Sequence, residues 1–170
     1  DREIQGCTDN AEQIAFRRGA IEAWLLENHL SLDDLSAVVI RSSGAGLCKK
    51  GGTYLVTGKL RDGMYAAYRG SFPKAPHPSF IVLPLADEIL GSRPIPIYIV
   101  DPDGVDEFQD VAYITGHPDL PRSSGFHVLN HKAIARKASR DLGKRYEDAD
   151  LVVAHMGGGI SIAAHRHGLV

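Results

Sequence analysis

The sequence of 170 residues has only two cysteines, no long apolar run and almost no net charge. Cys7 and Cys48 follow no spacing pattern, which excludes a cysteine zinc site and a disulfide framework and favours the reducing cytoplasm. No apolar run approaches the roughly 20 residues that a membrane helix needs, so we expect no membrane partner. A formal net charge of −2 gives no basic surface, so we expect no nucleic-acid partner.

The residues that are present suit a globular α/β protein, with 44% hydrophobic and 24% charged residues. Short apolar runs alternate with segments of helical periodicity, which predicts alternating strands and helices. Strands are expected at residues 37–40, 53–57, 96–100, 151–154 and 160–164. Helices are expected at residues 9–28, 59–68, 79–90 and 126–142. The buried face of the last helix is predicted to consist of Val128, Ala133, Ile134, Ala138 and Leu142.

The most informative stretch is residues 151–164, where an apolar run, three glycines and a second apolar run follow one another. This pattern predicts a strand, a tight turn and a returning strand. The glycines are Gly157, Gly158 and Gly159. Residues without Cβ let a main chain approach a phosphate closely and aim N–H groups at it. A plain glycine-rich hairpin explains the pattern equally well, although the flanking His155 and Ser161 favour phosphate.

Two charged residues directly follow expected strands. Asp101 comes after residues 96–100, and Arg41 comes after residues 37–40. Ligands of open α/β sheets bind at the carboxyl ends of strands, where a carboxylate suits Mg²⁺ and a guanidinium suits a carboxylate or phosphate. Taken alone, Asp101 is better explained as a turn cap and Arg41 as a surface arginine.

Four histidines lie near expected element ends. His127 and His131 are four residues apart at the start of a helix and therefore share a face. Zinc binding is not expected, because no third ligand is suitably spaced. An imidazole at a helix N-terminus is instead suited to donate to a transferring phosphoryl group. His165 and His167 flank a turn, and both are predicted to be solvated.

Two segments together resemble butyrate kinase. Residues 126–136 contain the F-H-x-L-N-x-K-A pattern of that family, and residues 153–161 contain its V-A-H-x-G-G-G-I-S pattern. Smaller matches at residues 16–18, 51–54 and 100–107 extend the resemblance over nearly the whole chain. The resemblance implies an RNase-H-like α/β fold, shared with acetate kinase, sugar kinases and actin, in which a mixed sheet has flanking helices. It also implies that ATP lies between two such halves.

The resemblance implies transfer of the γ-phosphoryl group of ATP to butanoate, giving ADP and butanoyl phosphate with Mg²⁺ as the metal. On the family pattern, Asp101 matches the catalytic, metal-associated aspartate, Arg41 the arginine near the substrate carboxylate, and His127 the histidine that stabilises the transition state. The phosphate-binding residues would be His155, Gly157, Gly158, Gly159 and Ser161. His77 and His131 are candidates for the substrate pocket. The implied full-length protein is a cytoplasmic homo-oligomer whose partner is a short-chain carboxylic acid.

The chain departs from the family in two loops and at both ends. Arg41 is followed by Ser-Ser-Gly where the family has R-G-G, and the family's H-x-S-N-x-G is here His-Pro-Ser-Phe-Ile-Val from His77. The family's opening N-P-G-S-T-S-T-K is not present before Asp1. We interpret residues 1–110 as most of a first kinase domain and 111–170 as a linker and the start of a second, inactive alone. An acetate, propionate or branched-chain acid kinase, or a phosphate- or nucleotide-binding segment without catalysis, remains an alternative.

Overall fold

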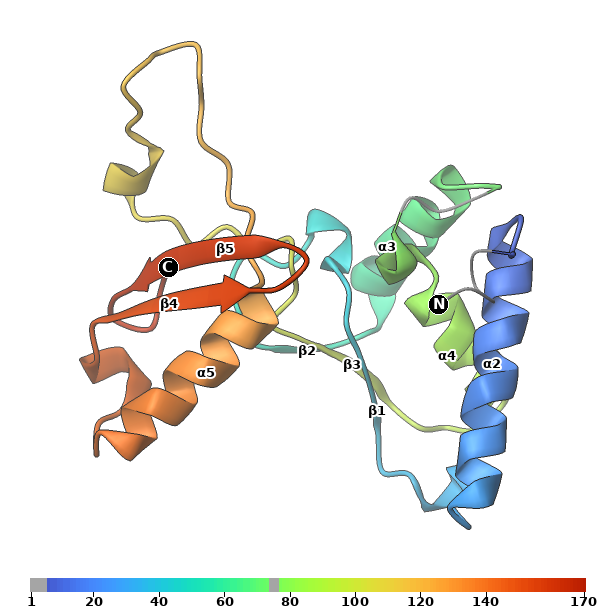
Figure 1. Cartoon of the computed structure of the whole chain (residues 1–170). Coiled ribbons are helices and arrows are strands. Elements are labelled where there is room, and N and C mark those ends of the chain that lie inside the picture. The colour runs from blue at the N-terminus through green and yellow to red at the C-terminus, as the bar shows by residue number, and fades with distance from the viewer. Residues whose placement is uncertain (1–5, 74–76) are drawn as a thin grey trace. The chain divides into compact units, whose positions relative to one another are not determined.

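The computed structural model describes residues 6–73 and 77–170 (Figure 1). The chain divides into two compact units. Unit 1 comprises Asp1–Ala45 and Thr53–Val100, and unit 2 comprises Gly46–Gly52 and Asp101–Val170. The assignment of kinase domains on either side of residue 110 stays a prediction.

Unit 1 contains a three-stranded mixed sheet, with strands where the sequence predicts them. Its strands are β1 (Val38–Ile40), β2 (Thr53–Leu55) and β3 (Ile97–Val100), in the order β1-β3-β2. The central β3 runs parallel to β1 and antiparallel to β2. Because β3 is enclosed by both neighbours, Ile97 and Ile99 are buried.

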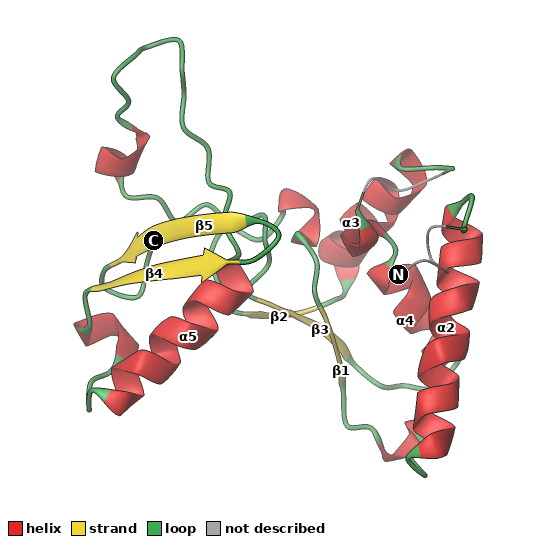
Figure 2. Cartoon of the chain, viewed as in Figure 1, coloured by secondary structure: helices red, strands yellow, loops and turns green. Residues whose placement is uncertain are grey.

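In the described part of unit 1, the α-helices are α2 (Asn10–Glu27), α3 (Gly58–Gly70) and α4 (Val82–Leu90) (Figure 2). The α2 helix begins where Asp9 accepts a hydrogen bond from the Glu12 N–H at 2.9 Å, as the D-x-x-E spacing of these residues predicts. Pro84 lies in the first turn of α4, where a missing N–H breaks no helical hydrogen bond. The hydrophobic core of unit 1 consists of Ile40, Val56, Met64, Leu83, Ala86, Leu90, Ile97 and Ile99.

Unit 2 is built from helix α5 (Val128–Asp141) and the hairpin of β4 (Leu151–Met156) and β5 (Ile160–His165). The two strands pair antiparallel from Leu151 opposite His165 to Met156 opposite Ile160, so the predicted strand, glycine turn and returning strand are confirmed. One face of the hairpin packs on α5, as Figures 1 and 2 show. The large side chains of the other face are exposed: Val152, Met156, Ile160 and Ile162.

The buried face of α5 differs from the predicted one, which is correct only at Val128. Ile134 and Leu142 are 48% and 62% exposed. The face that packs inward consists of Val128, His131, Lys132, Ala135 and Ser139. Apolarity alone indicates the wrong side of this helix, because the inward polar groups are satisfied by partners within unit 2. Among the residues that the structure describes, no helix is both long and apolar enough to span a membrane.

Candidate functional site

Two imidazoles lie against the glycine turn of unit 2. His127 precedes the first turn of α5 and His155 lies on β4; their rings stack with centroids 3.8 Å apart. A Cβ built on Gly159 would lie 3.3 Å from His127 Nε2, and one on Gly157 would lie 3.3 Å from His155 Nε2. The Nε2 edges of both rings therefore lie close to the turn because Gly157 and Gly159 have no Cβ. A side chain at either position would crowd the rings.

Ser161 joins two histidines rather than standing alone beside the turn. Its Oγ lies 2.8 Å from His127 Nδ1 and 2.9 Å from His131 Nε2. The backbone N–H of His127 also donates to this oxygen, at 3.3 Å. Register explains the contact, because Ser161 lies opposite His155 on the hairpin face that packs on α5. The hydroxyl thus fixes the ring of His127 at the helix start.

The expectation that His165 is solvated is wrong, whereas His167 is exposed as predicted. His165 is 1% exposed, and its Nε2 lies 3.4 Å from Nδ1 of the fully buried His131. Its Nδ1 lies 2.7 Å from the hydroxyl of Tyr146. Burial, followed by the positive charge of neighbouring groups, lowers the pKa of His165 to about 4, and burial also lowers the pKa of His131. Both rings are therefore neutral near pH 7.

Asp101 lies at the start of a buried charged network. Its side chain is fully buried, accepts a hydrogen bond from the Gly52 N–H at 2.8 Å, and pairs with Arg136 at 2.6 Å and 3.3 Å. This two-point contact holds the carboxylate in one orientation and raises the pKa of the Arg136 guanidinium. Its backbone φ of +43° is one that few residues other than glycine adopt. Sequence reasoning had singled out Asp101 but not Arg136, five residues after His131.

A second ion pair, buried on both sides, lies beside the first, in which Arg136 is 41% exposed. Lys132 Nζ is 2.8 Å and 2.6 Å from the two carboxylate oxygens of Glu107, and both side chains are almost fully buried. The Gly51 N–H donates to the same Glu107 carboxylate. A Cβ on Gly51 would lie 2.6 Å from Lys132 Nζ and 2.8 Å from Asp101 Oδ1. Gly51 is therefore enclosed by both ion pairs and has no room for a side chain.

The carboxylate of Asp101 is engaged by Arg136 and Gly52 and does not by itself form a coordination site for Mg²⁺. Within the described part of the chain, no group of three or more His, Cys, Asp and Glu side chains is arranged to hold a metal ion. An association of Mg²⁺ with Asp101 would be indirect.

The remaining candidates, Arg41 and His77, belong to unit 1. Arg41 follows β1 and is exposed. The next residue, Ser42, is buried and donates to the carbonyl of Ser79 at 3.4 Å. His77 accepts a hydrogen bond from the Ser79 N–H at 3.2 Å and so caps the short helix η3 (Pro78–Phe80). Arg41 and His77 thus flank one contact between two loops of unit 1.

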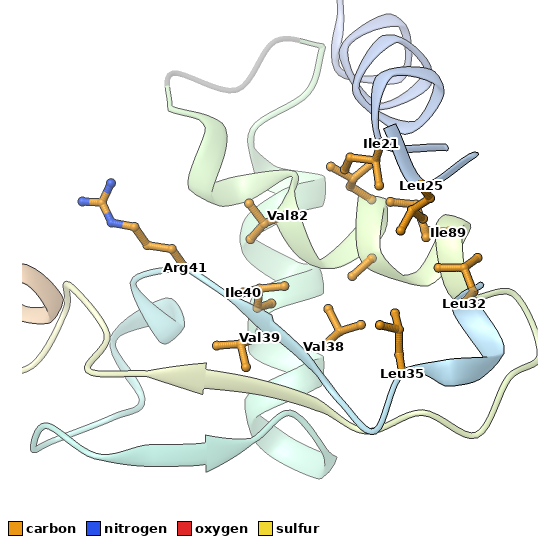
Figure 3. Close-up of a pocket in the computed structure, with 12 residues that line it drawn as sticks. Ile21, Leu25, Leu32, Leu35, Val38, Val39, Ile40, Arg41, Val82 and Ile89 are labelled. Atoms are coloured by element: carbon orange, nitrogen blue, oxygen red, sulfur yellow. The ribbon is translucent and has the colours of Figure 1, made fainter. Parts of the chain in front are cut away.

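A pocket of about 340 Å³ lies beside Arg41 in unit 1. It is lined from α2, α4, β1 and the segment before β1 by Ile21, Leu25, Leu32, Leu35, Val38, Val39, Ile40, Arg41, Val82, Leu85, Ala86 and Ile89. Figure 3 shows the guanidinium of Arg41 extending away from the apolar side chains. The pocket therefore offers a mainly apolar surface.

Several known proteins are similar to this chain in sequence. The model of the Acetokinase family matches residues 116–170, which include both histidines and the glycine turn. The chain is 41% identical over 161 residues to a probable butyrate kinase of Clostridium botulinum, covering 94% of this chain and 43% of that protein. It is 39% identical over 170 residues to butyrate kinase 1 of Clostridium acetobutylicum, covering 99% and 46%. The chain thus spans a little under half the length of these relatives.

Solved structures show the same fold. An acetate kinase of Porphyromonas gingivalis matches with a TM-score of 0.60 at 20% identity, over 82% of this chain and 36% of that one. A propionate kinase from Francisella tularensis matches with a TM-score of 0.58 at 20% identity, over 89% and 39%. The predicted fold class, a mixed α/β segment of the actin-like kinase fold, is therefore confirmed. The predicted resemblance to butyrate kinase, within the acetokinase family, is confirmed by the sequence matches.

Proposed function

We propose that the complete protein is a carboxylate kinase that transfers the γ-phosphoryl group of ATP to butanoate, giving ADP and butanoyl phosphate. The observation that carries this proposal is the stacked pair His127 and His155, whose Nε2 edges face a turn of three glycines. The names of relatives at 39–41% identity support butanoate as the acceptor. That the protein works as a cytoplasmic homo-oligomer with Mg²⁺ stays a prediction from the family resemblance.

The chemistry asks for positioning and charge stabilisation more than for proton transfer. A carboxylate is already an anion at neutral pH, so the acceptor needs no general base. One carboxylate oxygen attacks the γ-phosphorus in line, and the bond to the oxygen that bridges the β- and γ-phosphates breaks, leaving ADP. The protein must therefore hold two anions together and stabilise charge on the transferring oxygens.

The described residues are assigned roles in this reaction. His127 donates from Nε2 to a phosphoryl oxygen, His155 stacks against its ring, and the glycine turn lets the oxygens approach the main chain. Arg41 orients the acceptor carboxylate, and His77 is a candidate for contact with the acceptor. Asp101 is the catalytic aspartate, with its orientation fixed by Arg136. Ser161 and His131, which are hydrogen-bonded to one another, act through His127.

The test uses the complete protein with ATP, Mg²⁺ and a panel of short-chain acids, and acyl phosphate is trapped as hydroxamate. We expect butanoate to be the best acceptor and Asp101→Asn to lower kcat by about 10²- to 10³-fold, the usual effect of losing one preorganised polar group. Asp119→Asn, at an exposed carboxylate of unit 2, is the matched control and should leave kcat unchanged.

The outcomes separate the alternatives. A preference for acetate, propionate or a branched acid would revise the acceptor and keep the reaction. Tight ATP binding in calorimetry without acyl phosphate from any acid would contradict catalysis and favour nucleotide binding alone. An enzyme indifferent to Asp101→Asn would contradict the role of that residue.

A further inference from the structure

A chain of hydrogen-bonding side chains runs from His127 into the interior of unit 2. It passes from His127 Nδ1 to Ser161 Oγ at 2.8 Å and on to His131 Nε2 at 2.9 Å. It continues from His131 Nδ1 to His165 Nε2 at 3.4 Å and ends at the Tyr146 hydroxyl, 2.7 Å from His165 Nδ1. A neutral imidazole donates from one nitrogen and accepts at the other. All the hydrogen bonds in this chain of side chains must therefore donate in the same direction.

The partners of Ser161 allow two directions for the chain. The backbone N–H of His127 always donates to Ser161 Oγ. The hydroxyl can then accept a second bond and donate one, which uses all three of its hydrogen-bonding positions. It either accepts from His131 and donates to His127, or accepts from His127 and donates to His131. The local geometry at Ser161 suits both.

Tyr146, at the far end, distinguishes the two directions. Its hydroxyl is bonded to His165 Nδ1 and, among the described residues, has no further hydrogen-bond partner. If His165 donated to this oxygen, the phenolic proton of a buried residue would have no acceptor, at a cost of about 1–3 kcal/mol. Burial raises the pKa of Tyr146 to about 12, so the phenol keeps its proton throughout the physiological range. Tyr146 therefore donates.

The direction then propagates through the chain. Because His165 accepts at Nδ1, it carries its proton on Nε2 and donates to His131 Nδ1. His131 in turn donates from Nε2 to Ser161, which donates to His127 Nδ1. We propose that Tyr146, His165, His131 and Ser161 are positioning residues that hold His127 in the tautomer with its proton on Nε2.

This tautomer places an N–H donor at the glycine turn. His127 Nε2 is the atom that lies 3.3 Å from a Cβ built on Gly159. In the opposite tautomer this edge would present a lone pair to an anion and repel it. The link to catalysis rests on the proposed function, whereas the tautomer itself follows from the hydrogen bonds within unit 2.

The test is ¹⁵N NMR of the complete, histidine-labelled protein, with the signals of His127 assigned by loss in His127→Gln. We expect a proton on Nε2 and a bare Nδ1 in the unmodified protein. In Tyr146→Phe the chain loses its terminal donor, so the signals of His127 should shift toward a mixture of both tautomers. Tyr113→Phe removes an exposed hydroxyl of the same unit and should leave the spectrum unchanged.

Steady-state kinetics distinguish a positioning role from a merely structural one, because only the former predicts a change in kcat without a change in the KM for ATP. Tyr146→Phe should lower kcat about tenfold while the KM for ATP changes less than about twofold, since the donor matters most in the transition state. Ser161→Ala, which removes the group next to His127, should give the same tautomer mixture and serves if Tyr146→Phe folds poorly.

Several results would overturn the proposal. A proton on Nδ1 of His127 in the unmodified protein would show that the chain has the opposite direction. An unchanged His127 tautomer in both Tyr146→Phe and Ser161→Ala would show that the chain does not set it. A protein with the expected tautomer and tautomer shifts but no kinase activity would contradict the proposed function and leave the positioning chain established.

Discussion

The interiors of the two units are built from different chemistry. Unit 1 encloses aliphatic side chains around the central strand β3, where Ile99 is completely buried. Unit 2 has a small apolar cluster of Ala135, Tyr146 and Val153. Among the described residues, six buried side chains of unit 2 are polar or charged: Asp101, Glu107, His131, Lys132, Ser139 and His165. The buried polar residues of unit 1 are Asn10, Gln13 and Ser42, and none of them is charged.

This difference separates stability from positioning. Aliphatic burial stabilises in proportion to area and has little directional preference. Buried hydrogen bonds and ion pairs add little net stability, but each fixes an orientation, and breaking one leaves a costly unpaired group. The proposed catalytic groups Asp101 and His127 are attached to the polar interior. The polar interior of unit 2 therefore fixes the orientation of these side chains, but substitutions within it should be more destabilising.

The largest expected effect comes from breaking the Glu107–Lys132 pair. Lys132→Met leaves a buried carboxylate without its cation and should lower the free energy of unfolding of unit 2 by about 3–5 kcal/mol. Hydrogen exchange of the α5 amides, followed by mass spectrometry, measures this unit separately from unit 1.

Two variants sharpen this prediction. Lys137→Met breaks an exposed pair with Asp141 on the same helix, where both side chains are more than 60% exposed, and should cost less than about 0.5 kcal/mol. Adding Glu107→Gln to Lys132→Met removes the unpaired charge and should restore part of the loss. Equal losses for Lys132→Met and Lys137→Met would contradict the view that the interior of unit 2 depends on charge pairing.

An apolar deletion in unit 1 should have a somewhat smaller effect. Leu83 is 1% exposed in the aliphatic core, and Leu83→Ala should cost about 3 kcal/mol through lost burial and the cavity left behind. Leu83→Met, which nearly conserves volume, should cost less than about 1.5 kcal/mol. Urea unfolding followed by fluorescence of Trp24, the single tryptophan, reports on this unit. A loss for Leu83→Ala that varied between pH 5 and 7 would be inconsistent with an apolar environment around Leu83.

The same contrast explains how far the sequence predicts the fold. In unit 1 the apolar runs before Arg41 and Asp101 predict β1 and β3, because periodicity and burial agree there. In α5 the periodicity of apolar residues and the observed burial disagree. Ile134 is exposed while Lys132 is buried, and only the partner Glu107, 25 residues earlier, explains the difference. A partner so far away in sequence leaves no periodic signal.

The candidate site was partly predictable for a similar reason. Three glycines next to His155 mark a turn that something approaches closely, and the structure shows that the imidazoles of His127 and His155 do so. His165 was missed, although its spacing of four from Ser161 on one strand places both on the same face. Alternation along the strand was the available signal. No sequence pattern indicated Tyr146 or Arg136, because their partners, His165 and Asp101, come from other elements.

The smallest of these effects is a dependence of unit 2 on pH. His165 has a pKa of about 4 when folded, against an ordinary value of 6.5, because burial and the nearby His131 and Lys132 disfavour its protonated form. The unfolded chain therefore binds this proton more readily. The stabilisation by neutral His165 is complete above pH 6.5 and is lost as the pH falls toward 4. The lowered pKa of His131 acts in the same direction.

Between pH 7 and pH 5, His165 alone should lower the free energy of unfolding of unit 2 by about 2 kcal/mol. Hydrogen exchange at the two pH values, corrected for intrinsic exchange rates, gives this difference for α5 and the hairpin. His165→Gln removes the titrating group and should remove this part of the pH dependence, whereas His167→Gln, at an exposed ring, should retain it. A hairpin equally stable at both pH values would mean that His165 is not held neutral, and the one-way chain to His127 would lose its fixed direction.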